Sequence, residues 1–460
     1  MAAGRLRLLG PSMAIATLGL AGCSSGDAAL STASVAAVTP GISDRDLSRR
    51  EWLVETHAVP GAEPPPGRTS ALTLKSAINR ALTYNPSLKA AFIEIEAKHG
   101  EEAQAAVKPN PELALDIEDF AGSKDKAGFR TAQETLQITQ LIELGDKRLA
   151  RLRSAHLDAA IAGWDYETAR VQVVTLTAEL FVDALSAQER VKVLKNFVTV
   201  AEKTRSSVNA RVQAGKSSPI ELDRATVALA RAKSAVAAEQ LRFETARRRL
   251  SALWGADQID FAGIEGRLNG SQMVPSLERV RAYLDRNPTI ARWSDEIGRR
   301  YAVLDVERSR SIPDVKLGAG LRTFQENDAV AVVASVSVPL QIFDTNSGNI
   351  AAAERRVAKA ENDEQAARGT LTSSLFEALG ALQVAASQAR ALQNEILPAA
   401  ESAFEKTQLS YDEGKFDLLN VLDTQRTLFE VRLDLVNARA EYHKAKVQVE
   451  ALIGHQLEGL

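Results

Sequence analysis

Apolar residues recur at heptad-like steps in two long segments of the chain, 219–254 and 418–453. In the later segment the steps alternate between three and four residues from Val421 to Leu452. The earlier segment repeats these positions, with Glu239 as its one charged member. This spacing is typical of helices that pack side by side with knobs in holes. Alanine at many of the positions favours a layer of close helices over a thick globular core.

These segments belong to an internal repeat of about 200 residues, the feature to look for first in a chain of this length. Two dipeptides occur in both halves at nearly the same spacing: Asn-Pro at 85 and 287, and Gly-Lys at 215 and 414. They define two structural repeats, 71–254 and 277–460. A glycine-containing segment, 255–276, joins the repeats. It is expected to lie at the equator of the molecule, the level where helices stacked end to end meet.

Each repeat contains the same elements in the same order. A helix of about 35 residues is followed by two alternating segments, a very long helix, a Gly-Lys turn and a shorter return helix. The predicted helices are 72–107, 146–214 and 219–254, then 277–311, 347–413 and 418–453. At about 1.5 Å per residue, a return helix spans only half of a long one. We therefore expect 219–254 to be continued by 277–311, and 418–453 by 72–107.

The alternating segments predict two β-hairpins, 112–141 and 314–339. In 112–120, for example, Leu113, Leu115 and Ile117 alternate with acidic residues. Strands of about ten residues are long enough to cross an outer membrane when tilted. Periodicity alone also allows two soluble hairpins packed on a core. Four strands cannot close a wide barrel, whereas three copies supply twelve, so the membrane interpretation requires a trimer.

The N-terminus predicts a processing signal. Arg5 and Arg7 precede a short apolar run, and residues 20–23, Leu-Ala-Gly-Cys, form a lipobox. Residues 1–23 are then a lipoprotein signal peptide, and Cys23 carries a covalent lipid as the only non-protein group. The alternative is an ordinary signal peptide. The Ser-, Pro- and Gly-rich segment 24–70 reads as a periplasmic tether. No apolar run of about 18 residues follows, so membrane insertion must use strands.

Composition excludes several functions. The net charge of −3 gives no reason to expect nucleic acid as a partner. The five histidines show no paired metal-ligand spacing, and no nucleophile, phosphate-binding or paired-carboxylate motif occurs. We therefore expect neither an enzyme nor a metal site. A non-conducting coiled-coil lipoprotein of the cell envelope stays open as an alternative, although it does not explain the hairpins.

Residues 414–425, Gly-Lys-Phe-Asp-Leu-Leu-Asn-Val-Leu-Asp-Thr-Gln, resemble the helix-tip turn and "DVLD-x-Q" helix start of the TolC-like outer-membrane efflux factor family. Residues 213–222 resemble the equivalent tip of the first repeat. Residues 141–148, Leu-Ile-Glu-Leu-Gly-Asp-Lys-Arg, are similar to the heavy-metal, CzcC-like branch. The resemblance implies a mainly α fold with a small β part: antiparallel coiled-coil helices, and a trimeric twelve-stranded barrel continued by a helical barrel.

The resemblance also implies function. A lipid-anchored homotrimer in the outer membrane, its stem in the periplasm, would dock onto a periplasmic adaptor and an inner-membrane RND pump as a passive duct. Heavy-metal cations are the first expected cargo, and drugs or other small organic molecules the second. Asp423 matches one acidic position of the family's periplasmic gate, and Asn420 replaces the other. Three Asp423 carboxylates near the axis of a trimer would repel anions and favour cations. The residues expected at the tips for adaptor docking are Gly215, Lys216, Ser217, Gly414, Lys415 and Phe416. The two glycines are expected to supply left-handed or sharply turned backbone, and the other four residues to be exposed.

Overall fold

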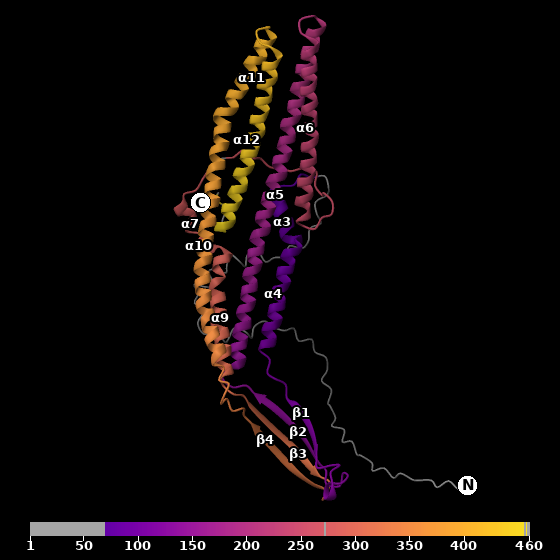
Figure 1. The fold of residues 1–460 in the computed structure, drawn as a ribbon, viewed down its shortest axis with the longest axis vertical. Helices are drawn as coiled ribbons and strands as arrows, with labels where there is room; N and C mark the ends of the chain where they lie inside the picture. The colour runs from indigo at the N-terminus through magenta and orange to yellow at the C-terminus, as the bar shows by residue number, and fades with distance from the viewer. Residues whose placement is uncertain (1–69, 271–272, 455–456, 458–460) are drawn as a thin grey trace, which may run out of the picture. The chain divides into compact units, whose positions relative to one another are not determined.

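Long α-helices and one small antiparallel sheet make up the protein in the computed structural model (Figure 1). The structure describes residues 70–270, 273–454 and 457, which belong to the compact unit Ala62–Leu460. The predicted signal peptide, Cys23 and nearly all of the tether lie outside the described residues. The predicted fold class is confirmed as far as a mainly helical chain with a small antiparallel sheet.

The helices follow the predicted order in both repeats. In the first they are α3 (Leu74–Tyr84), α4 (Pro86–Ala105), α5 (Lys147–Gln213) and α6 (Pro219–Ala252). In the second they are α7 (Leu277–Arg281), the 3-10 turn η2 (Leu284–Arg286), α8 (Pro288–Ala291), α9 (Trp293–Arg310), α10 (Ser347–Ala391), the π-helical segment η3 (Leu392–Ile396), α11 (Leu397–Asp412) and α12 (Leu418–Ile453).

The helices form a layer with α5 near its middle. α5 packs against α4 and α6 and also against α9 and α12 (Figure 1). α10 packs against α9 and α12, and α11 packs against α12. At 67 residues, α5 is about 100 Å long. No single partner helix matches that length, so α5 must be covered by two shorter helices placed end to end.

The predicted pairing of these shorter helices is wrong. Asn85 caps α4, because its side-chain oxygen accepts from the N–H of Leu88 at 3.0 Å, and its Nδ2 donates to the carbonyl of Leu253 at 2.8 Å. The second repeat has the same junction, since Asn287 bonds Thr289 N–H at 2.8 Å and the Leu452 carbonyl at 3.0 Å. Each return helix is therefore continued by the first helix of its own repeat.

Three predicted helices are interrupted rather than continuous. The residue before a proline avoids the helical region, and Asn85, with φ −63° and ψ 121°, accordingly separates α3 from α4. The range 277–311 forms short segments before α9, which has only 18 residues. In the range 347–413, η3 comes just before Pro398. A proline removes one backbone donor and clashes with the preceding turn, and the wider π turn accommodates this.

The four strands form one sheet in the order β1-β2-β3-β4. They are β1 (Glu112–Glu118), β2 (Gln133–Ile142), β3 (Val315–Phe324) and β4 (Ala329–Ser337), all paired antiparallel. The pairing of β2 with β3 joins the two repeats. β1 and β4 are the edge strands, and within the residues that the structure describes each has one side without a partner strand.

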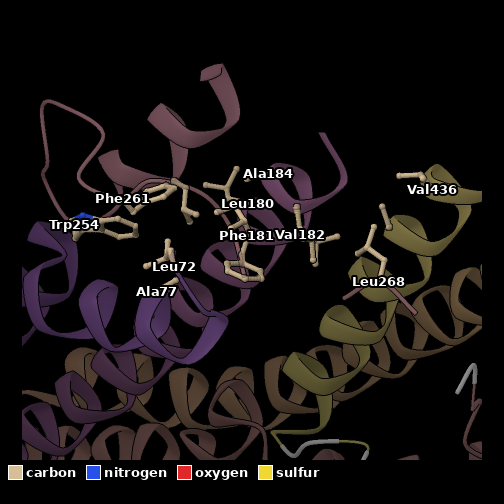
Figure 2. Packing of buried hydrophobic residues seen from close by; sticks show 14 residues of the cluster. Leu72, Ala77, Leu180, Phe181, Val182, Ala184, Trp254, Phe261, Leu268 and Val436 are labelled. Atoms are coloured by element: carbon tan, nitrogen blue, oxygen red, sulfur yellow. The ribbon is translucent and has the colours of Figure 1, made fainter. Parts of the chain in front are cut away.

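The largest cluster of buried apolar residues lies where α3 meets α5 and α6 (Figure 2). Residues 255–270 contribute to it, since Phe261, Ile264 and Leu268 are buried there. Ile264 forms a parallel bridge with Leu72, and the Gln188 side chain of α5 bonds both its N–H and its carbonyl, at 3.0 and 2.8 Å. The cluster stabilises the region where the stacked helices meet end to end.

Candidate functional site

The two faces of the sheet differ sharply in polarity. One face is apolar and exposed in the single chain; its large side chains are those of Leu113, Leu115, Ile117, Leu136, Ile138, Leu317, Leu321, Val330, Val332 and Val336. The opposite face is polar and ion-paired: Lys316 lies 2.5 Å from Glu112, and Arg322 lies 3.5 Å from Glu118. A sheet with one exposed apolar face and one polar face fits a position between lipid and water.

A polar groove, here called the α5 groove, follows one face of α5. Four cavities of about 660, 290, 260 and 440 Å³ lie along it, lined from Asp158 to Arg190 of α5. The lining residues of α5 recur every three or four positions, so they form one continuous face. This face is about 50 Å long. α4 and α6 contribute lining residues, as do α9, α10 and α12.

Most charged groups of the α5 groove are paired. Arg299 contacts Asp158 and Glu296, each at 3.2 Å. Partial burial raises the pKa of Glu296, but the hydrogen bonds and charge of Arg299 and Arg300 outweigh it and lower that pKa below its usual value. Lys444 lies 2.6 Å from Asp183. Burial lowers the pKa of Lys444, but the hydrogen bonds and charges of Asp183 and Glu441 together outweigh it and raise that pKa. The groove therefore contains many charged side chains, whose charges nearly balance.

Glu239, the charged residue among the apolar heptad positions, is 3% exposed. Its carboxylate is bound by Arg190 of α5 at 2.7 Å and by Arg242 at 3.0 Å. Arg190 also donates to Asn437 of α12 at 3.1 Å. A buried carboxylate requires such partners. Sequence reasoning missed Arg190, although a charge at a buried heptad position was a signal that a partner should exist.

Both helix tips have the predicted left-handed glycines, with φ of 68° at Gly215 and 79° at Gly414. Glycine reaches this region without steric cost. The N–H groups of Lys216 and Lys415 then bond back to helix carbonyls, each at 2.8 Å, as at many glycine-ended helices. Phe416 is 50% exposed.

Ser217 differs from the other predicted tip residues. It is half-buried, and its hydroxyl accepts from Arg211 at 3.4 Å. The expectation that Ser217 is exposed is therefore wrong, because Arg211 turns back across the tip. Arg211 also reaches the second tip, where it donates to the Tyr411 carbonyl at 3.1 Å and lies 4.6 Å from the Tyr411 ring. The sequence contains no signal for this contact between repeats.

The two predicted gate residues lie exposed at the start of α12. Asp423 accepts from Arg426 at 2.9 Å. Asn420 is one turn earlier, and its carbonyl accepts from the Thr424 hydroxyl at 3.0 Å. The chain thus places both side chains at the tip, and it adds a basic partner that the gate prediction did not include.

Across the ranges that the structure describes, no cluster of three or more His, Cys, Asp or Glu residues could hold a metal ion. Two histidines do share a carboxylate: His156 and His99 lie 2.8 and 3.1 Å from the two oxygens of Glu102. This contact links α4 to α5. Within the same ranges, no helix is long and apolar enough to cross a membrane.

The fold and its surfaces define a protein of the efflux-channel class, and comparison with known proteins agrees. The family model described as "Outer membrane efflux protein" matches residues 77–256 and 280–455. The cobalt-zinc-cadmium resistance protein CzcC of Cupriavidus metallidurans is 34% identical over 83% of this chain and 90% of its own length. The chain belongs to the outer membrane efflux protein family.

Further comparisons show the same relationship. The nickel and cobalt resistance protein CnrC of Cupriavidus metallidurans is 28% identical over 73% of this chain and 76% of its own length. The crystal structure of CusC shares the fold, with a TM-score of 0.72 at 15% identity over 86% of this chain and 96% of that one. The predicted resemblance is confirmed, and the chain is not a mere coiled-coil spacer of the cell envelope.

Proposed function

We propose that three copies of this chain form the exit duct of a tripartite, RND-type metal efflux system in the outer membrane. The observation that carries this proposal is the sheet, whose apolar face is exposed and whose edge strands β1 and β4 each have one unpaired side in the described part of the chain. A closed barrel in a membrane buries the apolar face of the sheet against lipid and pairs every strand edge. Pairing β1 of one subunit with β4 of the next closes twelve strands and removes every edge.

The helix layer supports the same closure through the internal repeat. Within the chain, α12 packs on α5 through Phe429, Val436 and Ala440. The equivalent α6 residues, 199 positions earlier, are Ala230, Ala237 and Leu241, which are exposed. Leu241 is 68% exposed. We infer that this α6 surface packs against α11 of the neighbouring subunit as α12 packs against α5.

The α5 groove then becomes the wall of the conduit. Its paired charges make it wettable without a fixed binding site, which suits passive conduction. Heavy-metal cations are the proposed cargo because CzcC and CnrC, by their names, are metal resistance proteins. The energy would come from the pump, and the tips at Lys216 and Lys415 would meet the adaptor. The lipid on Cys23 would anchor each subunit.

Electron microscopy of the detergent-purified protein tests the assembly. We expect three-fold particles with a detergent belt at one end and a hollow helical stem. The variant Leu241→Asp should lose the trimer, because it places a charge in the inferred subunit contact. Gln240→Asp is the matched control, since Gln240 is also exposed but lies about 100° away from Leu241 around α6. Monomers without a detergent belt would contradict the proposal.

The cargo needs a separate test in cells. Deleting the chain in its host should increase sensitivity to cobalt, zinc and cadmium, and plasmid-borne expression should restore resistance. Sensitivity to organic antibiotics should change little. The opposite pattern would keep the duct and reassign its cargo to small organic molecules.

A further inference from the structure

One side of α12 is exposed near the tip and borders the α5 groove toward the equator. Asp423, Glu430, Asn437 and Lys444 follow one another every seven residues along it, a spacing that returns to the same side of a helix. Asn437 and Lys444 line the α5 groove. The surface that contains Asp423 is thus the extension of the groove toward the tip, here called the tip stripe.

The tip stripe contains one basic side chain between its two carboxylates. Arg426 donates to Asp423 at 2.9 Å and lies 3.8 Å from Glu430. Asp423 and Arg426 are 62% and 67% exposed, so water weakens the attraction between them. Their charges nevertheless occupy the same level of the stripe. An ion passing there therefore meets the field of both groups rather than the field of Asp423 alone.

The internal repeat adds positive charge at the same level. On α6, the positions equivalent to Asp423 and Glu430 are occupied by Arg224 and Arg231, both exposed. In the proposed trimer, α6 and α12 alternate around the duct. Each subunit then contributes three positive and two negative side chains to the two levels nearest the aperture. The three Asp423 carboxylates of the trimer therefore cannot determine the net charge of this surface.

We propose that Arg426, together with Arg224, compensates the carboxylates of the aperture, and that Arg426 keeps the aperture from selecting cations over anions. This inference rests on the proposed duct. It replaces the expectation that three Asp423 carboxylates make the opening cation-selective. The wild-type aperture passes small cations and anions at comparable rates, and charge selection is left to other parts of the assembly.

Reversal potentials of single channels in planar bilayers under a potassium chloride gradient test this inference. We expect the wild-type permeability ratio of potassium to chloride to lie near one. Arg426→Gln should raise that ratio on the order of fivefold, as expected for removing one charge about 4 Å from a passing ion in water. Asp423→Asn should lower it by a similar factor.

Arg432→Gln is the matched control. It removes the same charge from the opposite side of α12, where Arg432 donates to Glu401 of α11 at 2.9 Å, and it should leave the ratio unchanged. A strongly cation-selective wild type, or an unshifted ratio in conducting Arg426→Gln channels, would overturn the inference. Failure of every protein to conduct, with assembled trimers absent, would instead count against the duct itself.

Discussion

Replacing Asn85 tests whether one amide side chain holds two helices end to end. Asn85 is 8% exposed. Its oxygen caps α4 through the Leu88 N–H, and its nitrogen satisfies the carbonyl of Leu253 at the end of α6. Asp caps a helix about as well as Asn does, but it has no N–H to donate. Asn85→Asp therefore removes the α6 contact and keeps the cap, whereas Asn85→Ala removes both.

The expected magnitude follows from these two bonds. Loss of an N-cap costs about 1 kcal/mol, and a buried carbonyl left without a donor costs about 1–3 kcal/mol more. We expect Asn85→Ala to lower the local free energy of opening by about 2–4 kcal/mol. Asn85→Asp should lose about 1–3 kcal/mol, because its carboxylate also repels the Leu253 carbonyl.

Hydrogen exchange of the amides in residues 86–92 measures this local opening. A loss of about 2 kcal/mol corresponds to about 30-fold faster exchange. Thr73, whose hydroxyl caps α3 by accepting from Ser76 N–H at 3.2 Å, provides the control: Thr73→Asp should leave exchange nearly unchanged. If Asn85→Asp exchanges as slowly as the wild type, the bond to α6 contributes nothing and the junction argument fails.

Two other predictions concern pH and the sheet. Partial burial raises the pKa of Glu102, but the hydrogen bonds and charges of His156 and His99 together outweigh it and lower that pKa. The stabilisation that Glu102 contributes is therefore present above the unfolded pKa of 4.5 and is lost as the pH falls through the folded pKa. Exchange of α4 amides should rise below about pH 4.5 in the wild type and show a smaller pH dependence in Glu102→Gln. Gly320→Ala should impair barrel assembly, because a β-carbon there would lie 2.4 Å from a backbone oxygen of β2. Gly318→Ala should be tolerated better, since its closest contacts are side-chain ends, and equal amounts of heat-resistant trimer from both variants would contradict this reasoning.

The order and length of the elements could be predicted from the sequence alone. Helix and strand periods are local properties, and capping and turn residues mark element ends within a few positions. The return helix 418–453 and the hairpins were found for this reason, as were the left-handed glycines at 215 and 414. The family could also be recognised, because the tip motif of 414–425 is contiguous in the chain.

Contacts between distant segments were decided only by the tertiary structure. Heptad spacing specifies which side of a helix is buried but not which helix covers it, so the stacking of α4 on α6 was assigned to the wrong repeat. The partners of Glu239 and Asp423 were missed, because a charge pattern does not name the side chain that neutralises it. A linear sequence records local preference, whereas pairing depends on which of several compatible surfaces gives the best packing and satisfies the buried polar groups.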